Sequence, residues 1–243
     1  MRAASRRVES NPKEYTFFEH LDEFKDCLTK SVLAVILASC LIYSFIDHIM
    51  AFLIRPVGRL VFTAPAEAFV AQMYLTFFCG FLVSLPYVLY QVWQFVSSGL
   101  RPHERKYISL YGPLSLMCFV LGSIFAYFVM IPISLQFLLS FSSDHIVPMI
   151  TVQKYISFLG SMVLSFGVVF ELPLILMFLT RIGIATPAFL IQKRRHAIVL
   201  IMVVSAILTP PDVVTLFLMS IPLIVLYEIG ILISSITYRS KEI

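Results

Sequence analysis

The chain is built from long apolar runs separated by short polar segments. The long runs are Ser31–Ile46 with its continuation to Ile54, Ala68–Phe95, Tyr107–Leu139 and Tyr155–Thr180. A helix needs about 20 mostly apolar residues to cross the hydrocarbon core of a bilayer. The pattern therefore predicts an all-α, polytopic membrane protein.

A fifth apolar region is broken in its middle. Ala197–Leu208 and Val213–Ile236 flank a segment that contains Pro210 and Pro211. Two adjacent prolines remove backbone hydrogen bonds that a helix interior needs, so we expect a helical hairpin, six spans in all, and short last two helices. Twelve residues rise only roughly 18 Å, against a core of about 30 Å. Three alternatives remain: flanking residues extend this helix, the bilayer thins locally, or the segment forms a re-entrant hairpin.

The basic residues predict the orientation. Of the 18 Lys and Arg residues, only Arg55, Arg59 and Lys154 fall on one side of the predicted spans. Cytoplasmic loops carry the excess of positive charge, so both termini should be cytoplasmic. We expect one membrane domain over residues 1–243, with a cytoplasmic tail and amphipathic helix at 1–30, six helices over 31–236 and a second tail at 237–243.

Composition excludes several classes of protein. Hydrophobic residues make up 59% of the chain and charged residues 13%, against about 45–50% and about 25% in soluble domains. A cytosolic enzyme, a disordered protein and a secreted disulfide scaffold are therefore excluded. The sequence has no HExxH, GxSxG or Walker A motif, and its four cysteines form no metal-binding pattern. We expect no enzyme activity, metal, cofactor or nucleic-acid partner.

Acidic residues gather on the predicted cytoplasmic side. Glu19, Asp22, Glu23 and Asp26 recur at helical spacing before the first span. Glu104 is the only acid in the loop after the second span. These carboxylates could pair with arginines in bidentate fashion. The alternatives are an ordinary solvated helix face for the stripe and a helix N-terminus for Glu104.

Three more acids lie in or beside predicted spans. Glu171 precedes Leu172-Pro173, and charges inside membranes are candidates for function by default. We expect a polar partner for Glu171 on another helix; an internal hydrogen bond is the alternative. Glu228 lies at a similar predicted depth, and Asp212 either caps the last helix or has another role.

Several motifs together resemble one family, the TatC family. They are Pro65–Phe69, Pro86–Phe95, Gly99-Leu100, His103–Arg105, Phe125–Phe128, Phe166-Gly167, Phe170–Pro173, Leu208–Asp212 and Tyr227–Gly230. They follow in order over nearly the whole chain, from about Glu19 to Gly230, which makes the resemblance highly specific.

The resemblance implies the core subunit of the twin-arginine (Sec-independent) translocase. That family exports folded proteins, recognises signal peptides with paired arginines, and uses the proton-motive force without ATP. It works in an oligomeric complex with single-span TatA- and TatB-type partners. The implied location is the inner (plasma) membrane, or a thylakoid-type membrane in an organelle.

The resemblance also implies roles for eight residues. The signal-peptide set comprises Glu23, Lys25, Phe95 and Glu104, and the partner-contact or structural set comprises Pro56, Tyr127, Glu171 and Asp212. Lys25 stands where the family usually has arginine, and Ser98 replaces a frequent proline. The rival classes are a secondary transporter with Glu171 as a proton relay, which lacks a visible repeat, and an intramembrane hydrolase, which lacks its motifs.

Overall fold

A computed structural model describes residues 17–58, 60–100, 108–142, 148–208 and 213–242. Within these ranges the chain is helical, apart from turns and one isolated β-bridge. The helices are α1 (Phe17–Tyr43), α2 (Ile46–Ile54), α3 (Pro65–Ser98), α4 (Ile108–Phe125), the π-helix η2 (Ala126–Met130), α5 (Ile131–Leu139), α6 (Val152–Val169), α7 (Leu172–Arg181), α8 (Pro187–Gln192), α9 (Arg194–Leu208) and α10 (Val213–Glu242).

Five helical segments within the described residues are long and apolar enough to cross a membrane. They are His20–Tyr43, Pro65–Ser98, Leu110–Leu139, Val152–Arg181 and Val213–Tyr238. The all-α, polytopic prediction is therefore confirmed. A sixth span through α9 stays a prediction, because its 15 residues rise only roughly 22 Å.

The prediction that both of the last two helices are short is wrong for the second of them. α9 is short, but α10 runs for 30 residues from Val213 to Glu242. The helix continues past the apolar stretch because the residues after Ile236 include no glycine or proline to end it. Pro222 lies inside α10 without interrupting it.

The first helix joins two segments that the sequence pattern predicted as separate elements. The predicted amphipathic helix and the first span form one continuous α1, because no glycine or proline occurs between Phe17 and Tyr43. α1 packs mainly on α3. At the contact, a β-carbon on Gly80 would lie 2.8 Å from the backbone nitrogen of Ser39, so glycine allows this close approach.

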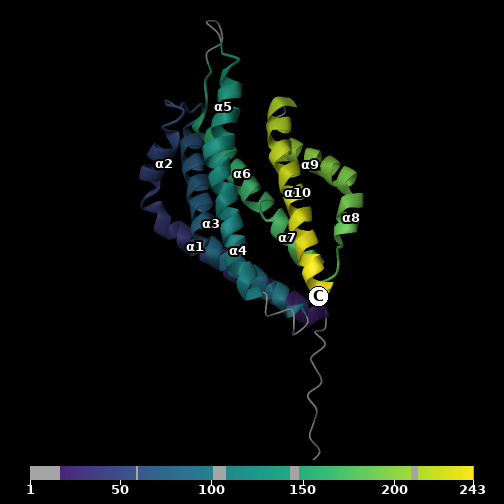
Figure 1. The fold of residues 1–243 in the computed structure, drawn as a ribbon. Coiled ribbons are helices and arrows are strands. Elements are labelled where there is room, and N and C mark those ends of the chain that lie inside the picture. Colours follow the sequence, from purple (N-terminus) through teal and green to yellow (C-terminus); the bar gives the residue numbers. More distant parts are fainter. Residues whose placement is uncertain (1–16, 59, 101–107, 143–147, 209–212, 243) are drawn as a thin grey trace, which may run out of the picture.

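The packing centre is α6, which contacts both α3 and α4. Phe166, Leu159 and Ile156 of α6 are almost fully buried. α7 packs on α10, where Thr180 and Ser234 share a short buried hydrogen bond. Figure 1 shows the start of α1 and the C-terminus at one end of the molecule, which we call the terminal end.

The other end, which we call the opposite end, holds α2 and the end of α5 (Figure 1). Here Val61 and Thr151 form the isolated β-bridge, with the Val61 N–H 3.1 Å from the Ile150 carbonyl oxygen. The Tyr155 hydroxyl donates to the carbonyl oxygen of Leu53 over 2.8 Å. These bonds tie α2 and the α2–α3 loop to the start of α6.

Candidate functional site

A polar pocket lies between the start of α1 and the end of α3, at the terminal end. Its volume is about 280 Å³. Its lining residues are Glu23, Asp26, Cys27, Lys30, Gln91, Gln94, Phe95, Ser97 and Ser98. We call it the acidic pocket, because two members of the predicted acidic stripe, Glu23 and Asp26, face it.

The Glu23 carboxylate has an unsatisfied oxygen. Glu23 Oε2 is buried and accepts no hydrogen bond, although the side chain as a whole is 36% exposed. His20 Nδ1 lies 3.6 Å from Glu23 Oε2, which is beyond hydrogen-bond distance. A buried acceptor without a donor costs about 1–3 kcal/mol, and more when it is charged. The pocket therefore favours a ligand that brings its own N–H donors.

An aromatic ring forms another wall of the pocket. Phe95 stacks on His20 with ring centroids 4.5 Å apart and planes 20° from parallel. It also meets Phe24 at 5.4 Å. The face of an aromatic ring attracts a guanidinium or ammonium group. The carboxylate and the ring thus present complementary features to the same kind of ligand, an organic cation.

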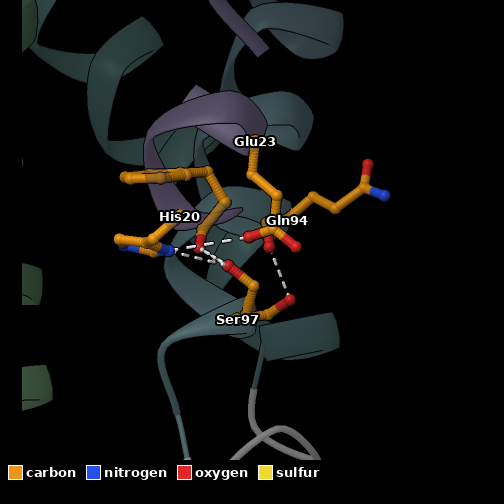
Figure 2. Close-up of polar contacts among 6 residues, drawn as sticks. His20, Glu23, Gln94 and Ser97 are labelled. Carbon is orange, nitrogen blue, oxygen red and sulfur yellow. Dashed lines mark hydrogen bonds and ion pairs between the residues drawn. The ribbon is translucent and has the colours of Figure 1, made fainter. Parts of the chain in front are cut away.

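Short hydrogen bonds fix the end of α3 beneath the pocket. The Ser97 hydroxyl donates to the Gln94 carbonyl oxygen over 2.6 Å, and the Ser98 hydroxyl donates to that of Phe95 over 2.8 Å. Ser98 Oγ also lies 3.5 Å from His20 Nδ1. Figure 2 shows His20, Glu23, Gln94 and Ser97 converging from the two helices. The first two bonds lie within α3, and the Ser98–His20 contact joins the last turn of α3 to α1.

The structure brings together two of the four residues predicted for peptide binding. Glu23 and Phe95 both line the acidic pocket. Lys25 is exposed on α1 and is not among the lining residues. Glu104 lies outside the described residues.

Sequence reasoning missed Gln91 and Gln94, which line the pocket, and His20, which stacks on Phe95. His20 precedes Glu23 by one helical turn, and Gln91, Gln94 and Ser98 follow the same rhythm along α3. That shared spacing, three to four residues apart, is the signal that could have grouped them. Among the described residues, no group of three or more His, Cys, Asp or Glu is placed to hold a metal ion.

A second acidic position lies at the junction of α6 and α7. Glu171 immediately precedes α7, with Pro173 at the second position of that helix. The Ser115 hydroxyl of α4 donates to Glu171 Oε1 over 2.9 Å. This polar partner lies on another helix of the same chain, so the bond is also the internal hydrogen bond named as the alternative. A carboxyl group has a second oxygen that can accept further bonds.

Glu228 has a different kind of partner. Arg194, the first residue of α9, places Nη2 2.6 Å from Glu228 Oε2 on α10. Nearby, the Tyr227 hydroxyl donates to the Leu190 carbonyl oxygen over 2.9 Å. These contacts hold the α8–α9 segment against α10.

Two of the remaining predicted residues lie at the opposite end. Pro56 and Tyr127, far apart in sequence, line one hollow of about 310 Å³. Tyr127 stacks with Phe52 of α2 at 6.2 Å between ring centroids. Asp212 lies outside the described residues.

Comparison with known proteins identifies the family. The family model for the Sec-independent protein translocase protein (TatC) matches residues 19–222. The TatC protein of Carboxydothermus hydrogenoformans is 38% identical over 227 residues, covering 91% of this chain and 93% of that protein. The TatCd protein of Bacillus subtilis is 37% identical over 230 residues, covering 94% of this chain and 95% of that protein.

Solved structures agree. A crystal structure of the twin-arginine translocase receptor TatC superposes with a TM-score of 0.82 at 34% identity, covering 90% of this chain and 99% of that one. A second crystal structure of this receptor, in DDM, gives a TM-score of 0.81 and covers 88% of this chain and 98% of that one. The resemblance drawn from the motifs is confirmed: this multi-pass membrane protein belongs to the TatC family of Sec-independent protein translocases and is a transport component rather than an enzyme.

Proposed function

We propose that this chain is the core receptor component of a twin-arginine translocase. It binds the paired-arginine signal peptide of a folded cargo protein in the acidic pocket, on the cytoplasmic side of the inner membrane. Binding nucleates assembly of the export complex with TatA- and TatB-type partners, and the proton-motive force drives transport.

The observation that carries this proposal is the unsatisfied Oε2 of Glu23 in a pocket that Phe95 also lines. A guanidinium group offers five N–H donors in a planar fork, so it can satisfy the carboxylate and lie against the ring at the same time. Asp26 lines the same pocket and adds to its negative charge. One arginine of the pair therefore fits here.

The second arginine needs a second acceptor. We propose that Glu104 supplies it, because the α3–α4 segment that contains it follows directly on the last turn of α3. Lys25 is exposed beside the pocket, so we propose that it contacts polar groups of the peptide outside the arginine pair.

The other predicted residues have separate roles in this proposal. Glu171 binds a partner transmembrane helix through the carboxyl oxygen that Ser115 does not use. Pro56 and Tyr127 shape the opposite end of the molecule, and Asp212 caps the start of α10. None of them contacts the acidic pocket among the described residues.

Site-specific photo-crosslinking tests the proposal. A photoreactive residue at position 94, on the pocket wall, should capture a twin-arginine signal peptide in native membranes, and a twin-lysine peptide should be captured several-fold less. Glu23→Lys or Glu104→Lys should abolish capture while membrane insertion is unchanged. Equal capture of the two peptides, or undiminished capture in both variants, would reject the site.

A further inference from the structure

Two adjoining hollows at the opposite end of the molecule have no role in the proposed recognition of the signal peptide. One, of about 310 Å³, lies between α2 and η2; the other, of about 520 Å³, lies along α5. They share Pro56, Pro132 and Leu135. Ligand pockets span about 300–1,000 Å³, so each hollow is large enough to hold part of a small molecule.

Pro132 lines both hollows and follows a change in helix geometry. Proline has no N–H, so Pro132 cannot donate to the carbonyl oxygen of Phe128, four residues earlier. The helix widens to a π-helix over Ala126–Met130, and the Ile131 N–H bonds to Ala126 instead. Single π-turns of this kind occur frequently at functional sites.

The lining of the hollows changes from polar to apolar along the helix. Gln136 and Ser140 line the second hollow, towards the end of α5. Phe128, Ile131 and Leu135 line the first. Phe128 is 69% exposed, and in a membrane protein such a surface faces acyl chains. The polar part therefore lies nearer the water interface and the apolar part deeper in the bilayer.

The first hollow contains one charged side chain. Arg55 lines the first hollow, with its guanidinium carbon 5.8 Å from the centre of the Phe52 ring. Among the described lining residues of both hollows it is the only charged group. The groove thus joins one cation to an apolar wall, which complements an amphiphile with a single negative head.

We propose that the two hollows, which we call the lipid groove, bind an anionic phospholipid of the outer leaflet. The Arg55 guanidinium pairs with the phosphate in bidentate geometry. The headgroup lies beside Gln136 and Ser140, and one acyl chain runs along Phe128, Ile131 and Leu135.

A lipid suits this groove better than a protein segment does. An extended peptide would bring backbone N–H and C=O groups that the apolar lining cannot satisfy. A helix measures about 10–12 Å across with its side chains, which is too wide for hollows of these volumes. An acyl chain has no backbone polar groups to satisfy and is narrower than a helix.

Native mass spectrometry of the purified full-length protein tests the proposal. The protein is incubated with phosphatidylglycerol or phosphatidylcholine of equal chain length, and the retained lipid is counted. The wild type should retain the anionic lipid about tenfold better, as expected for one charge-assisted pair. Arg55→Gln should remove this preference, and Arg55→Lys should keep part of it. Lys154→Gln, an exposed cation on α6 outside the groove, is the matched control and should leave the preference unchanged.

A second variant tests the acyl-chain part. Leu135→Trp fills the place where the hollows join and should lower retention of both lipids several-fold, with a circular dichroism melt confirming that the variant is folded. A photoreactive residue at position 128 should capture lipid. Wild-type retention without headgroup preference, unchanged preference in Arg55→Gln, unchanged retention in Leu135→Trp, or capture of a peptide at position 128 would each overturn the proposal.

Discussion

At the scale of single residues, the acidic pocket depends most on Glu23. Glu23→Gln keeps the size of the side chain but removes its charge. A hydrogen bond to a charged group contributes about 1.5–3 kcal/mol, so we expect the affinity for a twin-arginine peptide to fall about tenfold to a hundredfold. Fluorescence anisotropy with a labelled peptide and purified protein measures this change.

The matched control is Asp22→Asn. Asp22 neighbours Glu23 on α1 but is exposed and does not line the pocket. The Asp22→Asn variant removes one negative charge from the same helical turn as Glu23→Gln does. An equal loss of affinity in both variants would show that the peptide responds to the general negative charge of α1 rather than to the Glu23 carboxylate.

His20 has a positioning role in this arrangement, because it stacks on Phe95 and approaches both Glu23 and Ser98. A stacked aromatic pair contributes about 0.5–1.5 kcal/mol, so His20→Ala should weaken peptide binding about two- to tenfold. His20→Phe should restore most of the affinity, since it keeps the ring. The control is His48→Ala, at an exposed position of α2, which should leave peptide affinity unchanged. Failure of His20→Phe to restore peptide binding would contradict the stacking role.

The sequence allowed Glu23 and Phe95 to be predicted, but not how they meet. Phe95 belongs to a motif of the family, and Glu23 belongs to an acidic stripe that is visible by its helical spacing. His20 and Gln94 share the helical spacing of their neighbours, but that spacing alone does not assign them to a pocket, because a polar residue near a helix end usually faces water. Only the packing of α1 against α3 shows that these side chains share a pocket.

At the scale of helices, glycine at position 80 sets the distance between α1 and α3. A β-carbon there would lie 2.8 Å from both the nitrogen and the Cα of Ser39, so Gly80→Ala should push the helices apart. Overpacking of this kind costs about 1–3 kcal/mol. We expect a lower midpoint of thermal unfolding in detergent, together with weaker peptide binding.

Gly112→Ala in α4 is the control for this effect. Nothing lies within 4 Å of the position of its β-carbon, and alanine favours a helix by about 1 kcal/mol over glycine. The variant should be as stable as the wild type or slightly more stable. A comparable loss of stability in both variants would mean that helix propensity, rather than the α1–α3 contact, decides the outcome.

Helix positions were predictable where hydrophobic runs are long, and less so where prolines occur. Pro86, Pro113 and Pro222 all lie inside continuous helices, whereas Pro132 follows a change to π geometry. The sequence cannot separate these cases, because the cost of a missing hydrogen bond depends on the neighbouring helices that pack around it. The end of α10 was missed for a related reason: polar residues can extend a helix beyond an apolar run.

At the scale of the whole molecule, the acidic pocket and Glu171 are built by different helices. The pocket is formed by α1 and α3, whereas Glu171 lies between α6 and α7 and bonds to α4. Sequence depth estimates placed Glu171 and Glu228 at one level, but they could not show that one meets a serine and the other Arg194. Such pairings depend on which helices are neighbours.

This separation predicts that the two functions can be lost independently. Glu171→Ala removes the carboxyl group proposed to bind a partner helix, and no residue of the acidic pocket contacts it among the hydrogen bonds of the described chain. We expect several-fold less TatA- or TatB-type partner to co-purify with the variant, while its affinity for the twin-arginine peptide stays at the wild-type value. Ser115→Ala leaves the carboxyl group in place and removes only its internal donor, so it should retain the partner. Unchanged co-purification with Glu171→Ala, or a parallel loss of peptide affinity, would show that the acidic pocket and Glu171 do not work as separate binding sites.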